Sequence, residues 1–238
     1  MHRKIINKII REFEKHFPEK KQKKKATSIL DTLIATKLSQ NTTDKSAIIA
    51  FQNLKDIFKS WDDLIDAPLS LIKKQIKVCG LADTKSKDLK NMLVQMKKEK
   101  GKLDLSYLKK MSNEEVYNDL LKYNGIGVKT VSCVLAFALN RDVFPVDTHV
   151  HRVLNRLGIV KTKSAEDTFE EAKTIISDKK KVFLHRAVIM FGRNICKAKN
   201  PICGICYLYD YCEFEEKENF VENKTKMKEN NFLILDKV

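Results

Sequence analysis

Glycine, proline, tryptophan and long apolar runs are all scarce in this sequence. The 238 residues include seven Gly, four Pro and one Trp. Gly and Pro together make up less than half of their usual share, which argues against turn-rich all-β folds and against disordered or collagen-like chains. No apolar run approaches the roughly 18 residues of a membrane-spanning helix, so the sequence excludes an integral membrane protein.

A signal-peptide pattern is also missing, because Lys8 interrupts the apolar stretch near the N-terminus. We therefore expect a cytoplasmic protein in a reducing compartment, where the six cysteines would not form a disulfide framework. A chain of this length is expected to form one large domain or two small ones. Its core is expected to be stable without covalent cross-links.

Acidic residues are too few to balance the basic ones. Lys and Arg number 46, Asp and Glu 31, and the formal net charge is +15. Fourteen of these fifteen excess charges lie in residues 1–25 and 179–199. Two cationic blocks predict a polyanionic partner, most simply nucleic acid. Taken alone, the lysine run at 20–25 fits a solvated linker equally well.

Apolar residues recur at helical spacing along the chain, with short breaks and no alternating strand pattern. The predicted fold class is therefore all-α, with helices near residues 5–13, 29–38, 43–54, 68–80, 83–98, 112–121, 131–139, 147–157, 164–176 and 180–191. The segment 131–139 is apolar on all sides, which predicts a helix buried at a domain centre. Residues 213–238 are mostly polar and acidic and are predicted to form a tail.

Four of the six cysteines lie within 17 residues, at Cys196, Cys203, Cys206 and Cys212. Such clustering disfavours ordinary core thiols and predicts one metal centre. Structural zinc usually shows two close CxxC pairs, and this segment has one. The common ferredoxin spacings do not match either, so spacing alone leaves zinc and iron–sulfur equally open. Cys79 and Cys133 lie in apolar helical segments and are predicted to be buried.

Residues 125–130 read Gly-Ile-Gly-Val-Lys-Thr between two predicted helices. A glycine turn before a helix exposes backbone N–H groups, which suits a DNA phosphate. A plain connection between helices is the alternative, and the spacing is not that of a P-loop. Lys129 lies in the first helical turn, where the helix dipole favours the neutral, nucleophilic amine. A solvated or phosphate-pairing lysine is the other interpretation.

A third motif, Pro-Val-Asp-Thr-His, occupies residues 145–149. Asp147 is predicted to be the N-cap of the helix that follows. A carboxylate there can also accept a proton from an amine or stabilise a cationic, sugar-like transition state. His149 is either a capping residue or part of the same site.

Together, in this order, G-h-G-x-K, V-D-T-H and C-x6-C-x2-C-x5-C resemble the endonuclease III family of helix–hairpin–helix base-excision DNA glycosylases, over about residues 26–213. The resemblance implies one [4Fe–4S] cluster on the four clustered cysteines, shaping a DNA-binding loop rather than performing redox catalysis. It also implies two α-domains with DNA in the groove between them. These are a six-helix barrel at 26–141, with the helix–hairpin–helix at about 112–140, and a cluster domain of 1–25 plus 142–212, followed by a tail at 213–238.

The same resemblance implies a nucleoid-associated, monomeric enzyme acting on double-stranded DNA with a damaged base or an abasic site. Lys129 would be the nucleophile and Asp147 its carboxylate partner. The implied function is a bifunctional glycosylase and abasic-site lyase that removes oxidised pyrimidines through a Schiff base and cuts the strand by β-elimination. One alternative is mainly an abasic-site lyase. Another is a non-catalytic, redox-sensing DNA-binding protein, which the intact pair of Lys129 and Asp147 disfavours.

Further residues match the family's DNA contacts. Gln40 or Asn41 would fill the space left by the flipped nucleotide, and Leu81 would act as a wedge. The remaining contacts implied are Gly125, Gly127, Thr130, His149, Arg193, Lys197 and Lys199.

A few positions depart from the family pattern. Tyr123-Asn124 replaces Leu-Pro before the hairpin, and Val128 replaces a basic residue; both changes bear on base preference rather than mechanism. Thr36 stands where adenine-mismatch relatives carry a catalytic Glu, which disfavours that activity. Finally, the apolar cluster Phe232–Leu235 predicts either contact with a sliding clamp or, preferentially, a tail that folds back on its own domain.

Overall fold

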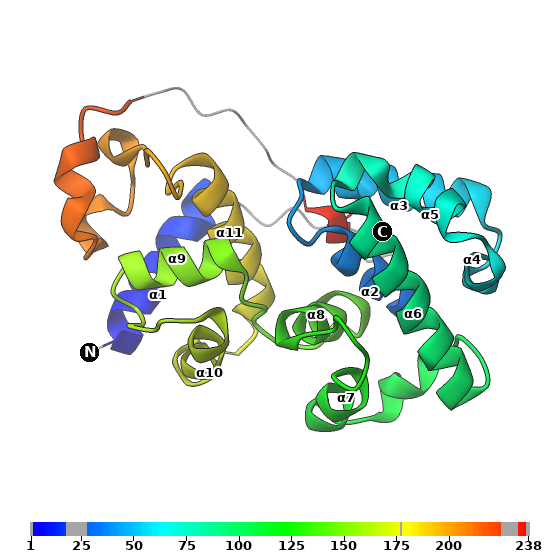
Figure 1. Cartoon of the computed structure of the whole chain (residues 1–238). Coiled ribbons are helices and arrows are strands. Elements are labelled where there is room, and N and C mark those ends of the chain that lie inside the picture. The colour runs from blue at the N-terminus through cyan, green and yellow to red at the C-terminus, as the bar shows by residue number, and fades with distance from the viewer. Residues whose placement is uncertain (1, 18–27, 177, 225–232, 237–238) are drawn as a thin grey trace. The chain divides into compact units, whose positions relative to one another are not determined.

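The structure, a computed structural model, describes residues 2–17, 28–176, 178–224 and 233–236. Every regular element in these residues is helical, which confirms the predicted all-α fold class (Figure 1). Within the same residues, no helix combines the length and apolar character needed to cross a membrane. The lysine run at 20–25 and Phe232 lie outside the described residues.

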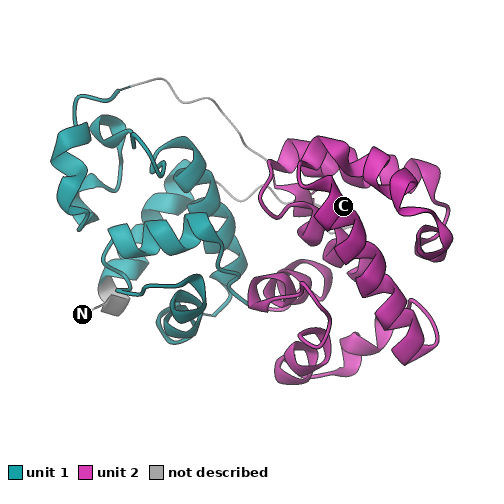
Figure 2. Cartoon of the chain, in the orientation of Figure 1, with its two compact units in different colours: residues 1–24, 142–231 teal, residues 25–141, 232–238 magenta. Residues whose placement is uncertain are grey.

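The chain divides into two compact units (Figure 2). Unit 1 comprises residues 1–24 and 142–231, and unit 2 comprises residues 25–141 and 232–238. Each unit therefore contains two separate segments of the chain, and the segments of the two units alternate along the sequence.

Unit 2 is built from seven α-helices and several shorter turns within the part of the chain that the structure describes. The α-helices are α2 (Ile29–Leu38), α3 (Asp44–Ile57), α4 (Trp61–Asp66), α5 (Leu69–Ile76), α6 (Ala82–Lys100), α7 (Asn113–Leu120) and α8 (Val128–Cys133). The shorter elements are the 3-10 turns η1 (Lys77–Cys79), η2 (Ser106–Lys110) and η7 (Ile234–Asp236) and the π-helical turn η3 (Val134–Ala138).

Helix α2 forms the centre of unit 2, where it contacts α3, α6, α8, η3 and η7. Nine of its ten residues are buried, and Asp31 is the exception. Its buried hydroxyl groups are satisfied within the helix, because Thr36 Oγ1 donates to the carbonyl of Thr32 at 2.7 Å. Burial of a polar group costs little free energy when its hydrogen bond is formed. Helix α2 therefore tolerates threonine in a core position.

Local side chains explain where most helices of unit 2 begin. The Ser112 hydroxyl accepts from the Glu115 N–H, and the Glu115 carboxylate accepts from the Ser112 N–H, and the two bonds together form a capping box. Helix α4 was not predicted, although Ser60 and Asp63 form the same kind of box at its start. Trp61 then ties α4 to α2, because its indole N–H donates to the Asp31 carboxylate at 2.6 Å.

Unit 1 contains four α-helices among the described residues. They are α1 (His2–His16), α9 (Thr148–Arg156), α10 (Ala165–Ile175) and α11 (Lys181–Asn194). Its 3-10 turns are η4 (Cys203–Ile205), η5 (Tyr209–Tyr211) and η6 (Glu215–Phe220). Helix α11 contacts α9 and α1 and buries ten of its fourteen residues, so it supplies the core of this unit.

Close approach between α9 and α11 depends on Gly192. A Cβ atom at this position would lie 3.1 Å from His149 Cβ and 3.2 Å from Arg152 Nη2. These separations are tighter than ordinary van der Waals contact, so a side chain here would push α9 away. Gly192 therefore helps to set the position of the helix that follows Asp147.

The C-terminal residues differ from the separate polar tail predicted for 213–238. Residues 215–220 form η6, which contacts η4 in unit 1. Leu233 and Ile234 are 4% and 3% exposed, and η7 contacts α2 and α3 of unit 2. The Ile234 N–H also donates to the Asp44 carboxylate at 3.2 Å. Burial of these side chains favours the tail folding back over the clamp contact, because an apolar anchor already in a core is not presented to a partner.

Candidate functional site

The glycine turn of residues 125–127 connects α7 to α8. Gly125 has φ 76°, a left-handed conformation that glycine adopts without strain. The Ile126 N–H donates to the Tyr123 carbonyl at 3.1 Å, and the Ile126 side chain is buried. No side chain caps the start of α8 at Gly127, so the first N–H groups of α8 are left for an external acceptor. Lys129 is half-buried in this first turn.

Helix α8 and the π-helical turn η3 form the buried segment predicted near 131–139, and Thr130 at its start is 1% exposed. Tyr123, which departs from the family pattern, is also 1% exposed and packs inside unit 2. Tyr117 Oη and Ser132 Oγ lie 2.7 Å apart and link α7 to α8. The turn is thus held between two packed helices, which fixes the backbone that carries Lys129.

A buried lysine that the sequence analysis missed also holds this turn. Lys37 on α2 is 5% exposed, and its Nζ donates to the Gly125 carbonyl at 3.2 Å. Burial lowers the pKa of Lys37 from its ordinary value, while the nearby Asp88 carboxylate opposes that effect. A lysine in the apolar face of a predicted helix is the signal that could have revealed it, since buried lysine needs a specific partner.

Asp147 is the N-cap of α9, as the sequence predicted. Its Oδ1 accepts from the N–H groups of His149 at 2.9 Å and Val150 at 2.8 Å. The carboxylate is half-buried, and the backbone before it is held from α11, where His185 Nδ1 lies 2.8 Å from the Pro145 carbonyl oxygen. His185 is 2% exposed and is a second positioning residue that the sequence analysis missed. Asp147 belongs to unit 1 and Lys129 to unit 2.

His149 lies on the first turn of α9, beside Arg152. Its Nδ1 is 3.2 Å from Arg152 Nη2. Burial, together with the charges of Arg152 and Arg193, lowers the pKa of His149, while Asp147 and a backbone contact with Gly192 oppose the shift. The imidazole is therefore neutral at neutral pH, which favours a hydrogen-bonding role over a phosphate-neutralising one.

The segments that carry Gln40, Asn41 and Leu81 are two short loops of unit 2. One follows α2 and the other joins η1 to α6. Asn41 and Leu81 both have left-handed backbone angles, with φ of 52° and 48°. Leu81 is 62% exposed, more than any other large apolar side chain that the structure describes. An exposed leucine in a strained conformation indicates function rather than packing.

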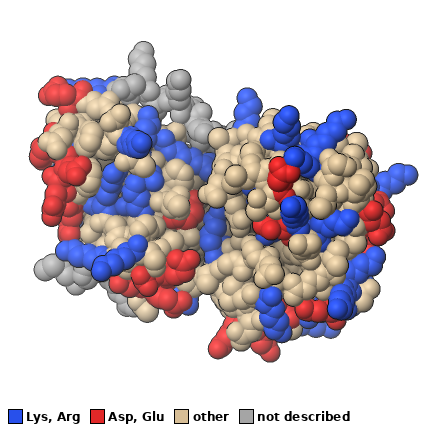
Figure 3. Space-filling model, viewed as in Figure 1, with Lys and Arg blue, Asp and Glu red and all other residues tan. Residues whose placement is uncertain are grey.

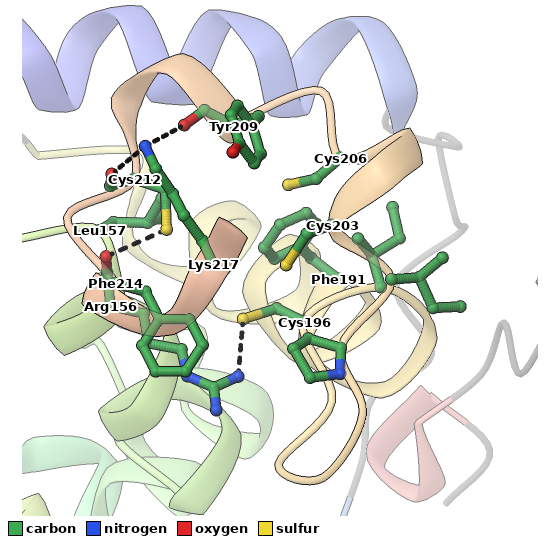
Figure 4. Close-up of a pocket in the computed structure, with 13 residues that line it drawn as sticks. Arg156, Leu157, Phe191, Cys196, Cys203, Cys206, Tyr209, Cys212, Phe214 and Lys217 are labelled. Atoms are coloured by element: carbon green, nitrogen blue, oxygen red, sulfur yellow. Dashed lines mark hydrogen bonds between the residues drawn. The ribbon is translucent and has the colours of Figure 1, made fainter. Parts of the chain in front are cut away.

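The four clustered cysteines line one pocket of unit 1, shown in Figure 4. All four are half-buried, whereas Cys79 and Cys133 are buried elsewhere, as predicted. The rest of the lining is mainly apolar, with two cationic side chains and no carboxylate: Arg156, Leu157, Phe191, Ile195, Pro201, Ile202, Tyr209, Phe214 and Lys217. Four sulfur donors around one largely apolar pocket fit an iron–sulfur cluster.

Two cations lie beside these sulfur atoms. Arg156 Nη1 is 3.5 Å from Cys196 Sγ and donates to the Lys197 carbonyl at 2.7 Å. Lys217 Nζ donates to the Cys212 carbonyl at 2.9 Å. Burial raises the pKa of the Cys206 thiol to about 12, with smaller contributions from the neighbouring cysteines. Thiolates are the binding form, so nearby positive charge and a bound cluster would both stabilise them.

The segment after the last cysteine covers this pocket and was missed as part of the site. Phe214 stacks on the Arg156 guanidinium, whose central carbon is 4.1 Å from the ring centroid. A Cβ at Gly204 would collide with the Val221 carbonyl oxygen, so the segment lies directly against the CxxC turn. Its acidic composition had suggested a solvated tail.

The predicted phosphate contacts lie at the end of α11 and just after it. Arg193 is half-buried on α11, Lys197 is half-buried, and Lys199 is exposed. Arg152 fixes this region, because its guanidinium donates to the carbonyls of Gly192 and Cys196, both at 2.9 Å from Nη2. On the face shown in Figure 3, Lys and Arg gather over the middle of unit 1, while Asp and Glu lie at its edges.

Comparison with known proteins shows which family the chain is similar to. Residues 34–178, more than half of the chain, match the HhH-GPD superfamily of base excision DNA repair proteins. Residues 196–212 match the iron–sulfur binding domain of endonuclease III. Endonuclease III of Thermotoga maritima is 32% identical over 227 residues, which cover 93% of this chain and 100% of the relative. The chain belongs to the endonuclease III family.

Two further comparisons agree. Endonuclease III of Sulfolobus acidocaldarius is 35% identical over 193 residues, covering 80% of this chain and 84% of the relative. A solved structure of a trapped endonuclease III–DNA covalent intermediate superposes with a TM-score of 0.78 at 27% identity, covering 91% of this chain and 98% of that one. Family membership confirms the predicted [4Fe–4S] cluster and decides between zinc and iron–sulfur, which spacing alone had left open.

Replacing Lys37 with Met should loosen the glycine turn while keeping most of the apolar stem of the side chain. The Gly125 carbonyl would lose a charged donor, a bond of about 1.5 to 3 kcal/mol. Amide hydrogen exchange in residues 123–127 should then accelerate about tenfold or more. Lys122→Met, which removes an exposed charge nearby, should leave this exchange unchanged. Equal exchange rates in both variants would contradict the role assigned to Lys37.

Replacing Cys206 with Ser should abolish the brown colour of the purified protein, since a hydroxyl is a poor ligand for an iron–sulfur cluster. The melting temperature should fall as well, because cluster binding contributes to the folding free energy of unit 1. Cys133→Ala, at a buried cysteine outside the pocket, should keep the visible absorbance and the iron content. Normal iron content in Cys206→Ser would refute the ligand assignment.

Proposed function

We propose that the chain is a bifunctional DNA glycosylase and abasic-site lyase that removes oxidised pyrimidines from double-stranded DNA. The observation that carries the proposal is Lys129, a half-buried amine in the first turn after a glycine hairpin. A structural relative has been trapped as a covalent intermediate with DNA, which requires a nucleophile in that protein. By its place in the G-h-G-x-K motif, Lys129 is proposed to be the nucleophile of this chain.

The proposed reaction starts with the damaged nucleotide flipped out of the stack. The Lys129 amine attacks C1′, the bond from C1′ to the base breaks, and the base leaves with the bonding electrons. Loss of the amine protons and opening of the sugar ring give a Schiff base between Nζ and C1′. A proton then leaves C2′ and the bond from C3′ to oxygen breaks, which cuts the strand on the 3′ side.

Asp147 is proposed to accept a proton from the attacking amine and to stabilise positive charge on the sugar. Its Oδ1 already holds two backbone N–H groups, so the carboxylate is fixed in one orientation. The proposal requires Asp147 and Lys129 to face the same nucleotide once DNA is bound.

The DNA-binding surface is proposed to include the glycine turn, the two loops with Asn41 and Leu81, and the basic residues near the cysteine loop. When bound, the cluster would supply a rigid core for that loop rather than a chemical step. Arg152 and Arg156 hold the backbone from Gly192 to Ala198. This arrangement would present Arg193, Lys197 and Lys199 to phosphates.

Borohydride trapping tests the proposed nucleophile. A duplex with one oxidised pyrimidine should form a covalent adduct with the wild-type protein, and Lys129→Gln should form none. Lys122→Gln removes a nearby exposed lysine and should trap normally. An adduct that persists in Lys129→Gln would assign the nucleophile elsewhere. Trapping only on a pre-formed abasic site would indicate a lyase with little base removal.

The Asp147→Asn variant distinguishes the proposed catalytic role of Asp147 from its role as the N-cap of α9. An asparagine oxygen can still cap α9, so the melting temperature should change little. Loss of the carboxylate should slow base removal about 100- to 10,000-fold in single-turnover assays. Asp142→Asn, in the segment before Asp147, serves as the charge-matched control. A rate for Asp147→Asn within about twofold of wild type would argue against the catalytic role.

A further inference from the structure

One lysine connects the two loops assigned to DNA insertion. Lys85 is half-buried on α6, and its Nζ donates to the carbonyls of Leu38 at 3.0 Å and Cys79 at 3.2 Å. Leu38 is the last residue of α2, immediately before the loop with Gln40 and Asn41. Cys79 is the last residue of η1, immediately before Gly80 and Leu81. A single ammonium group therefore joins the starting points of both loops.

The loop around Leu81 needs such support because its backbone is strained. Gly80 has φ 64° and Leu81 has φ 48°, so two successive residues have positive φ. For a leucine this conformation costs about 1 to 2 kcal/mol. The Leu81 side chain is 62% exposed and gains little from packing. Such a conformation persists only when surrounding contacts impose it.

Lys85 supplies contacts on both sides of Leu81. Its side chain binds the Cys79 carbonyl before the strained residues, and its backbone N–H donates to the Leu81 carbonyl at 2.9 Å. The Cys79 thiol adds a link to α3, at 3.4 Å from the Ser46 carbonyl oxygen. The Lys85 side chain and the first backbone hydrogen bond of α6 thus hold the chain on both sides of Leu81.

The other loop is held from the same atom. The Leu38 carbonyl lies at the C-terminal end of α2, where a cation is favoured by the helix dipole. Burial lowers the pKa of Lys85, with the Cys79 thiol as the opposing influence. Burial of an ammonium group is costly unless its hydrogen bonds are made, so the two carbonyls and Lys85 stabilise one arrangement together.

We propose that Lys85 is a positioning residue that holds the Gln40–Asn41 loop and the Leu81 loop in one fixed frame, so that both enter a lesion site together. This inference rests on the proposed function, because it assigns the two loops to DNA insertion. Lys85 itself touches neither DNA nor the reacting atoms in this account. It acts by removing the freedom of each loop to move without the other.

The test uses a duplex with a stable abasic-site analogue and 2-aminopurine opposite it, whose fluorescence rises on unstacking. Lys85→Met should lower the preference for this duplex over undamaged DNA about tenfold, the effect of losing charge-assisted hydrogen bonds, and should reduce the fluorescence rise. Lys87→Met, at an exposed lysine on the same helix, should change neither. Lys85→Arg should restore part of both signals, because it keeps a cation at the site.

A double-mutant cycle separates positioning from general destabilisation. Because Lys85 is proposed to act partly through Leu81, Lys85→Met should cost less preference in the Leu81→Ala background than in the wild-type protein. Fully additive losses, or a Lys85→Met preference equal to that of Lys87→Met, would overturn the inference. If Lys85→Met fails to fold, Lys85→Gln replaces it, because the glutamine amide keeps N–H donors but carries no charge. Lys85→Gln is expected to give an intermediate loss of preference, and wild-type preference in this variant would also overturn the inference.

Borohydride trapping by the wild-type protein distinguishes this inference from the proposed function. Absence of both an adduct and a preference for the lesion duplex would refute the proposed function itself. A normal wild-type adduct, combined with no effect of Lys85→Met on preference or fluorescence, would refute only the role of Lys85.

Discussion

Two lysine side chains of unit 2 donate hydrogen bonds to backbone carbonyls at junctions between helices and loops. Lys37 binds the Gly125 carbonyl, and Lys85 binds the carbonyls of Leu38 and Cys79. Lys37 and Leu38 both lie in the C-terminal turn of α2, a helix with nine of its ten residues buried, and Lys85 links this turn to Cys79. A buried helix cannot shift without disturbing the core. The glycine turn and both short loops therefore take their positions from the same rigid element.

Unit 1 uses arginine in a comparable way. Helix α9 starts at Asp147 and carries Arg152 and Arg156 one and two turns further on, where both bind carbonyls of the segment around Cys196. The same short helix thus orients the proposed catalytic carboxylate and the start of the cysteine loop. Loss of the cluster should accordingly affect the basic residues near the loop and, through α9, the carboxylate as well.

The sequence predicted best those features that depend on residues close together in the chain. Helical spacing predicted the all-α fold, Asp147 was recognised as an N-cap, and the cysteine spacing located the cluster segment. Lys37, Lys85 and His185 were not found, because each acts on a carbonyl that is remote in sequence or hidden by the fold. The segment after Cys212 was misjudged because its acidic composition resembles a solvated tail, whereas Phe214 and Lys217 line the cysteine pocket. The amino-acid composition of a segment indicates how polar the segment is on average. It does not reveal which individual side chains make contacts.

The proposed function depends on covalent attachment of Lys129 to the sugar of a damaged nucleotide. The most direct test is to reduce the wild-type protein–DNA adduct, digest it with protease and nuclease, and locate the modified lysine by mass spectrometry. We expect a single modified peptide with the sugar remnant on Lys129. A remnant on another lysine, with Lys129 unmodified, would contradict it.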